Sequence, residues 1–233
     1  SKKQMKVNKL ILSIFVLLQS IGLQSCGQSN NTQEKKLLAI KETKKIDMQT
    51  ETNVNDTAAS IVLGGGCFWC VEAQYLMLDG VQKVESGYAG GNTENPTYKE
   101  VCTGLTNHAE VVKITYDPRK LSFDDILYAF WQSHDPTTLN RQGNDEGTQY
   151  RSVVFYSTEE EKQKTEAYIK KLNEEKAFDN PVVTQVAPLT KFYIAEDYHQ
   201  NYYNNNKTQG YCMFVVGPKV EKFKKIFKDK LKH

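Results

Sequence analysis

The sequence lacks a large excess of charge of either sign, and this bears first on the partners it can have. Its 30 lysine and arginine residues nearly balance its 28 aspartate and glutamate residues, so the formal net charge of the 233-residue chain is +2. Nucleic-acid binding usually needs a strongly basic face, which this composition does not indicate. The sequence also contains no internal repeat. Its length suits one soluble domain with an appendage.

A long apolar run is also missing. Four lysines near the start precede a largely apolar run at 10–18, which is too short to span a membrane as a stable helix. The sequence Leu23-Gln24-Ser25-Cys26 follows and resembles a bacterial lipoprotein signal. This resemblance implies a signal peptide at residues 1–25, a lipid on Cys26 and a membrane-anchored place in the cell envelope. An uncleaved anchor and an ordinary secretory signal are the alternatives.

The next segment has little that could form a core. Residues 26–59 are rich in Asn, Thr, Gln, Lys and Glu, with scattered aliphatic residues and no periodicity. Such a composition is typical of a flexible linker. We therefore expect a tether at 26–59 and a folded catalytic domain at 60–233.

Cysteine is sparse, with five in the chain. Apart from Cys26, the cysteines of the expected domain are Cys67, Cys70, Cys102 and Cys212. Structural zinc sites usually combine two closely spaced ligand pairs, and only Cys67 and Cys70 form such a pair. A zinc-stabilised module is therefore the weaker interpretation of these thiols, and we expect no bound metal.

The most informative motif is Gly64-Gly65-Gly66-Cys67-Phe68-Trp69-Cys70. It follows a short apolar strand predicted at 60–63 and precedes a helical stretch at 71–76. The glycines allow a sharp turn and the close approach of a ligand. A cysteine that opens a helix lies beside free backbone N–H groups, which favour the thiolate. The motif predicts a nucleophilic Cys67, with the aromatic pair as an apolar floor for a substrate group.

The remaining pattern predicts strands and helices in uneven alternation. Period-two stretches and turn residues predict strands at 81–88, 108–116, 151–156 and 181–187. Capping residues and apolar spacing predict helices from 122, at 158–176, at 195–204 and from 220 onward. This order indicates an α+β two-layer sheet-and-helix sandwich, for which we expect a ferredoxin-like (α-β plait) core.

Several further motifs lie along the domain in one order. They are Ser86-Gly87-Tyr88-Ala89-Gly90-Gly91, Asn95-Pro96-Thr97-Tyr98, His108-Ala109-Glu110, Asp135-Pro136-Thr137, residues 142–152, Tyr198-His199-Gln200 and Gly210-Tyr211-Cys212. Together with the Cys67 motif, they resemble the peptide methionine sulfoxide reductases of the A type (MsrA). The resemblance covers nearly the whole folded domain. One departure is Asn107, which stands where the family usually has glycine.

The resemblance implies an enzyme that reduces methionine (S)-sulfoxide, free and in proteins, without a cofactor. Cys67 takes the position of the nucleophile and Glu110 that of the acid which protonates the sulfoxide oxygen. Tyr98 and Tyr150 take the positions that hydrogen-bond this oxygen. The substrate-binding positions of the family are occupied here by Phe68, Trp69 and Asp145.

Attack on the sulfoxide leaves Cys67 as a sulfenic acid, which a second thiol must resolve. Cys70 lies one helical turn away, close enough to bridge. In many family members the position of Cys212 resolves instead. We expect the disulfide Cys67–Cys70 first and a second disulfide with Cys212, although direct resolution by Cys212 is the alternative. Cys102 is expected to be passive.

The expected partners follow from this chemistry. Thioredoxin, a thioredoxin-like protein or dithiothreitol would reduce the final disulfide, and oxidised proteins and free methionine sulfoxide are the substrates. We expect the chain to act as a monomer. The competing enzyme is a thioredoxin-like oxidoreductase that uses Cys67 and Cys70 alone; it would not need Glu110 or the two tyrosines.

Overall fold

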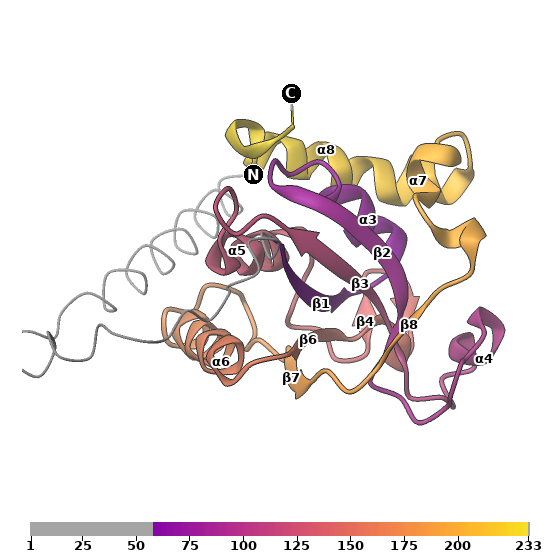
Figure 1. Cartoon of the computed structure of the whole chain (residues 1–233), viewed down its shortest axis with the longest axis horizontal. Helices are drawn as coiled ribbons and strands as arrows, with labels where there is room; N and C mark the ends of the chain where they lie inside the picture. The colour runs from indigo at the N-terminus through magenta and orange to yellow at the C-terminus, as the bar shows by residue number, and fades with distance from the viewer. Residues whose placement is uncertain (1–57, 233) are drawn as a thin grey trace, which may run out of the picture.

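A computed structural model describes residues 58–232, and the predicted signal peptide, Cys26 and most of the tether lie outside this part. The described chain forms one curled six-stranded sheet with helices against it (Figure 1). The strand order is β7-β6-β1-β3-β2-β8. The strands of this sheet are β1 (Ala59–Gly65), β2 (Val81–Ala89), β3 (Ala109–Tyr116), β6 (Ser152–Tyr156), β7 (Gln185–Pro188) and β8 (Phe192–Ile194).

The four inner strands pair antiparallel, whereas β7 joins β6 in parallel. Alternate side chains of each strand serve different faces, as the pleat requires. In β1, Ile61 and Leu63 enter the main core beneath the helices, and Val62 enters a smaller cluster on the opposite face. The predicted α+β class is therefore confirmed.

The helices differ in how they begin. The α-helices are α3 (Phe68–Tyr75), α4 (Tyr98–Cys102), α5 (Phe123–Ser133), α6 (Glu159–Glu174), α7 (Tyr202–Asn205) and α8 (Gly217–Ile226). Ser122 caps α5 in a reciprocal capping box with Asp125, as the sequence predicts for a helix at this position. The cap of α6 is Thr158, the first residue of the stretch predicted for this helix.

Three predicted elements differ in the structure. The strand expected at 181–187 is shorter, because its first residues precede β7. The helix expected at 195–204 is broken by Asn201, whose φ of 52° lies in the left-handed region. The last helix begins earlier than predicted, with a π-helical turn at Cys212–Val216 that continues into α8. In Figure 1, α8 runs beside α3 and so carries the end of the chain back over the Cys67 helix.

The polar, glycine-containing stretch at 135–147, for which the sequence predicts a loop, contains a small hairpin, formed by β4 (Arg141–Gln142) and β5 (Asp145–Glu146). Gly143 turns this hairpin with φ 65°. The hairpin therefore brings Asp145 from a polar loop to the turn that carries Cys67. Among the described residues, no helix is both long enough and apolar enough to cross a membrane.

Candidate active site

Cys67 stands where β1 turns into α3. The turn is made by Gly66, whose φ is +90°. A Cβ atom at this position would lie only 2.5 Å from the side chain of Gln142. A side chain at Gly66 would meet both a conformational penalty and this contact. Cys67 is the N-cap residue of α3 and is 6% exposed. The strand–turn–helix predicted from the glycine run is confirmed.

A cavity of about 310 Å³ opens at this turn. It brings together every residue predicted for catalysis or substrate binding, from five separate segments of the chain. Cys70 and Cys212 are not in its wall. The lining residues are Cys67, Phe68, Trp69, Tyr98, Glu110, Asp145, Tyr150, Tyr202, Gln209 and Tyr211.

Glu110 enters the cavity from β3 and is 1% exposed. Its Oε2 accepts a hydrogen bond of 3.1 Å from the backbone N–H of Phe68, in the first turn of α3. Burial raises the pKa of this carboxyl well above its ordinary value, and charge on Cys67 raises it further. The side chain is therefore suited to hold a proton at neutral pH. Just before β3, Asn107 has φ 56°, so asparagine supplies the left-handed turn that glycine would favour.

The expectation that the helix start makes Cys67 a thiolate is wrong for the unliganded site. Burial raises the pKa of the Cys67 thiol well above the ordinary value, and the neighbouring Cys70 raises it further. A side-chain hydrogen bond with Tyr211 acts in the opposite direction without reversing the shift. Desolvation of the thiolate outweighs the few free N–H groups of one helix turn. Sequence position alone does not show that burial.

Two phenols face the same space. Tyr98 begins α4, and Tyr150 ends a 3₁₀ turn at Thr148–Tyr150. Burial raises the pKa of both, and negative charge on Glu110 adds to this effect. They are therefore phenols rather than phenolates, and each keeps an O–H to donate.

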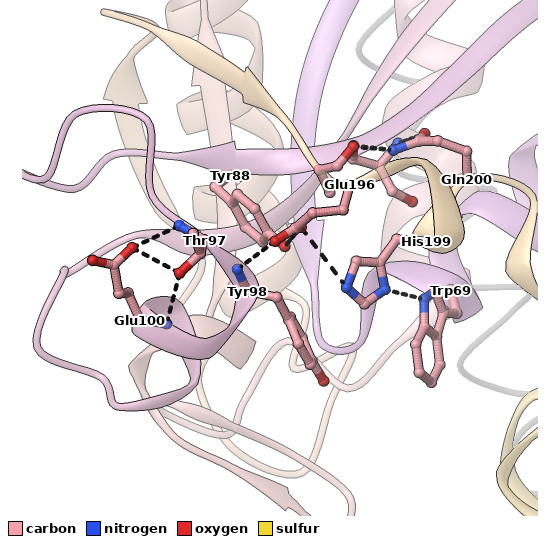
Figure 2. A network of polar contacts seen from close by, with 10 residues as sticks. Trp69, Tyr88, Thr97, Tyr98, Glu100, Glu196, His199 and Gln200 are labelled. Atoms are coloured by element: carbon pink, nitrogen blue, oxygen red, sulfur yellow. Dashed lines mark hydrogen bonds and ion pairs between the residues drawn. The ribbon is translucent and has the colours of Figure 1, made fainter.

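Trp69 is held by a network that the sequence interpretation did not assign. Its indole Nε1–H donates to Nδ1 of His199 at 3.1 Å, and its ring stacks on Tyr202 with centroids 3.7 Å apart. His199 Nε2 lies 3.9 Å from Glu196 Oε2. Figure 2 shows this chain from the carboxylate to the indole, with Glu196 also accepting a 2.8 Å bond from the backbone N–H of Tyr98. Glu196 therefore contacts the backbone of Tyr98 directly and Trp69 through His199, so it links two parts of the cavity wall.

Asp145 is held by Tyr211, whose hydroxyl donates to Oδ2 at 2.7 Å. The same hydroxyl is hydrogen-bonded to Cys67. Tyr211 directly precedes Cys212 in the chain, so one segment carries a phenol of the cavity wall and a buried thiol. The Gly-Tyr-Cys motif was the only sequence signal for Tyr211. His199 lies in the Tyr198-His199-Gln200 motif, which gave it no role, and neither spacing nor composition would single out Tyr202 or Gln209.

The structure describes three buried cysteines near the site, Cys67, Cys70 and Cys212, each as a free thiol. Cys70 follows Cys67 by one turn of α3, and its backbone N–H donates to the Cys67 carbonyl at 3.1 Å. Cys212 is fully buried at the start of the π-helical turn. Cys102, predicted to be passive, is exposed at the end of α4.

A family model described as peptide methionine sulfoxide reductase matches residues 59–231, nearly all of the described chain. This match covers every residue of the cavity. The chain belongs to the peptide methionine sulfoxide reductase family. Because the chain belongs to this family, neither the zinc-stabilised module nor the thioredoxin-like oxidoreductase describes it. Family members are thiol-dependent enzymes, and this reductase has Cys67 in the cavity wall and buries Cys70 and Cys212 in the same hydrophobic core.

Curated relatives carry the same description. The chain is 55% identical over 172 residues to peptide methionine sulfoxide reductase MsrA of Trichodesmium erythraeum, which covers 74% of this chain and 97% of the relative. It is 54% identical over 171 residues to peptide methionine sulfoxide reductase MsrA of Deinococcus radiodurans, and this match covers 73% of this chain and 83% of the relative.

Solved structures agree with the fold. Mxr1 from Saccharomyces cerevisiae in reduced form is 34% identical, with a TM-score of 0.63, and the match covers 67% of this chain and 90% of that one. Methionine sulfoxide reductase A of Corynebacterium diphtheriae is 37% identical, with a TM-score of 0.61, and the match covers 67% of this chain and 78% of that one.

Proposed function

We propose that this reductase acts on the S epimer of methionine sulfoxide, free and in oxidised proteins, with Cys67 as nucleophile and Glu110 as general acid. The observation that carries the proposal is the pairing of a buried, proton-holding carboxyl with a thiol in one aromatic cavity. Sulfoxide reduction needs both, because sulfur must be attacked while its oxygen is protonated. The enzyme needs no cofactor for this reaction.

The lining residues have complementary roles in this step. Phe68 and Trp69 form the apolar wall for the methyl group, and Asp145, another lining residue, binds the substrate. Tyr98 and Tyr150 donate hydrogen bonds to the sulfoxide oxygen. Such an arrangement fixes methyl, oxygen and lone pair at the same time, which is what discrimination between two epimers requires.

The thiolate of Cys67 attacks the sulfoxide sulfur as Glu110 gives its proton to the oxygen. The attack forms an S–S bond between Cys67 and the substrate. The protonated oxygen then passes from the substrate sulfur to the Cys67 sulfur while the S–O bond and this S–S bond break, so methionine leaves and Cys67 is a sulfenic acid. Cys70 then displaces this oxygen as water and forms the disulfide Cys67–Cys70. We propose that Cys212 next attacks Cys70, and the burial of all three thiols in one hydrophobic core supports this. A thioredoxin-like protein reduces the final disulfide by thiol exchange.

Turnover with separated sulfoxide epimers tests the activity. With dithiothreitol as reductant, the S epimer should be converted to methionine and the R epimer should remain. Preferential consumption of the R epimer would contradict the assignment. Peptide mapping of Cys212→Ser after one turnover tests the relay: we expect a Cys67–Cys70 disulfide, and a sulfenic acid on Cys67 beside free Cys70 would show that Cys212 resolves first.

We further propose that the protein is a lipoprotein of the cell envelope, anchored through Cys26. The support is the sequence pattern at 23–26, which follows a short apolar run and four lysines. In that case the full-length protein partitions into the detergent phase, and Cys26→Ala is released from membranes. Recovery of unmodified wild-type protein in the soluble fraction would overturn the anchor.

The core is, we propose, a ferredoxin-like plait. The order β6-β1-β3-β2, antiparallel throughout, supports this, as does the placement of α3 between β1 and β2 and of α5 between β3 and β6. In this description β7 and β8 are additions at the two edges of the sheet.

A further inference from the structure

A lysine from the C-terminal helix contacts the second cysteine of the motif. Lys219 lies in the first turn of α8, and its Nζ is 3.7 Å from the Sγ of Cys70. Cys70 is 2% exposed and lies 149 residues away in sequence. A cation at hydrogen-bonding distance stabilises a thiolate strongly when the sulfur is shielded from water.

The position of Lys219 is fixed by its surroundings. Its backbone carbonyl accepts a hydrogen bond of 3.5 Å from the side-chain amide of Gln74, which is on α3 one turn beyond Cys70. Its side chain also lines a second cavity of about 450 Å³, distinct from the substrate cavity. The half-buried ammonium thus stands between Cys70 and this second cavity. Within residues 58–232, no carboxylate forms a salt bridge with it.

We infer that Lys219 is a positioning residue that holds the negative charge of the Cys67–Cys70 pair on Cys70, so that Cys70 serves as the proton acceptor for Cys67. This inference rests on the proposed function, because it concerns the same reductive step. The side chains of the two cysteines are hydrogen-bonded to each other. In the resting site, Cys67 donates its S–H to the Cys70 thiolate, and the pair holds one proton.

The electron and proton balance closes with the groups already present. When substrate binds, the Cys67 proton moves to Cys70, and the Cys67 thiolate attacks sulfur while Glu110 protonates the oxygen. The protonated oxygen passes to the Cys67 sulfur as the substrate's S–O bond and its new S–S bond to Cys67 both break, so methionine leaves and Cys67 becomes the sulfenic acid. The Cys70 thiol then attacks the Cys67 sulfur: an S–S bond forms, the S–O bond breaks, and the hydroxide departs as water with the Cys70 proton. Glu110 is left ionised and regains a proton from solvent.

The charges around Cys70 favour this distribution. Its hydrogen bond with Cys67 and the ammonium of Lys219 lower the pKa of the Cys70 thiol, whereas burial and the Asp145 carboxylate raise it. Tyr211 also faces the pair, and burial keeps it neutral by raising its pKa. The net direction is a lowered pKa for Cys70 and a raised one for Cys67. The hydrogen bond with Cys67 has the largest lowering effect on the Cys70 pKa, and the nearby Lys219 ammonium adds to it.

Titration of thiolate absorbance in the full-length, reduced enzyme tests the inference without substrate. We expect one thiolate to form below the ordinary thiol range of about 8.5 in wild type and to be missing in Cys70→Ser. Lys219→Met should raise its midpoint by about one pH unit or more, and Lys219→Arg should restore it. Lys222→Met is the matched control, because Lys222 lines the same cavity one turn further along α8 and no contact with a cysteine is described for it. This control should titrate as wild type does.

Single-turnover reduction of the S sulfoxide gives the second readout. We expect Lys219→Met to form methionine roughly tenfold more slowly than wild type at neutral pH, and this ratio should shrink at higher pH as Cys70 ionises in the variant. An unchanged thiolate titration in Lys219→Met, or an early thiolate that persists in Cys70→Ser, would overturn the inference even if the enzyme is active. If Lys219→Met does not fold, Lys219→Gln takes its place in the titration, and the wild-type and Cys70→Ser titrations still test whether the early thiolate is that of Cys70. A normal titration with no sulfoxide reduction would instead contradict the proposed function.

Discussion

Glu110→Gln is the substitution that separates proton donation from packing. The amide has nearly the same shape, and its carbonyl oxygen can still accept the 3.1 Å hydrogen bond from the Phe68 N–H. The cavity should therefore keep its form. What is lost is the proton that the raised pKa of the buried carboxyl holds at neutral pH.

The expected loss follows from what remains in the site. Removal of a general acid typically costs on the order of 10²–10⁴-fold in rate. Tyr98 and Tyr150 still donate to the sulfoxide oxygen, so the lower part of that range applies. We expect single-turnover methionine formation to fall by a hundredfold to a thousandfold, which corresponds to about 3–4 kcal/mol in the barrier.

The assay is rapid-quench measurement of methionine formed per enzyme, across a range of pH. In wild type the rate should decline as the pH rises through the raised pKa of Glu110, because the acid form is lost. Glu110→Gln should lack that decline. A normal single-turnover rate in Glu110→Gln would refute the assignment of Glu110 as the acid.

Glu72→Gln provides the matched control. Glu72 is also a buried glutamate with a raised pKa, about 7, but its Oε1 accepts the backbone N–H of Asn201 outside the substrate cavity. Its substitution should leave the single-turnover rate within about twofold of wild type, since an amide can accept the same hydrogen bond. An equal loss in both variants would mean that burial of the carboxyl, rather than proton donation, explains the effect.

Other variants test separate parts of the site. Cys67→Ser should abolish turnover, because a hydroxyl at neutral pH is a far weaker nucleophile than a thiolate; residual turnover above a boiled-enzyme control would contradict this. Tyr211→Phe removes the 2.7 Å hydrogen bond to Asp145, and we expect roughly a tenfold loss of kcat/KM, whereas an unchanged value would show that this bond has no part in substrate binding. Glu72 has a folded-state pKa of about 7 against an ordinary 4.5, so its contribution to stability is full below pH 4.5 and is lost as the pH rises to 7. Glu72→Gln should therefore remove up to about 3 kcal/mol of that decline in denaturant unfolding between pH 4.5 and 8, and parallel curves for the two proteins would contradict the shift.

Local signals predicted much of the fold. The glycine run before Cys67 indicated a strand–turn–helix, and Ser122 with Asp125 predicted the start of α5, because turns and caps depend on residues close in sequence. The hairpin β4–β5 was missed, since two-residue strands leave no periodicity to detect. The break at Asn201 was missed for a related reason, because asparagine is compatible with both a helix and a left-handed turn.

The site was predictable only in part. The motifs identified the residues that line the cavity, but the charge state of the thiols depends on burial and on distant neighbours. The helix start suggested a thiolate at Cys67, whereas desolvation and Cys70 raise its pKa. Lys219 approaches Cys70 from another helix, and no local pattern links positions so far apart. Contacts of this kind appear only when the fold is known.

The most direct test of the account is one turnover of the Cys70→Ser/Cys212→Ser enzyme with the pure S epimer of methionine sulfoxide. With no resolving thiol beside it, the enzyme should release one methionine per chain and retain one oxygen as a sulfenic acid on Cys67, detectable by mass spectrometry after trapping. Release of methionine with Cys67 unmodified, or trapping of the oxygen on another residue, would contradict the central claim that Cys67 takes the oxygen from the substrate.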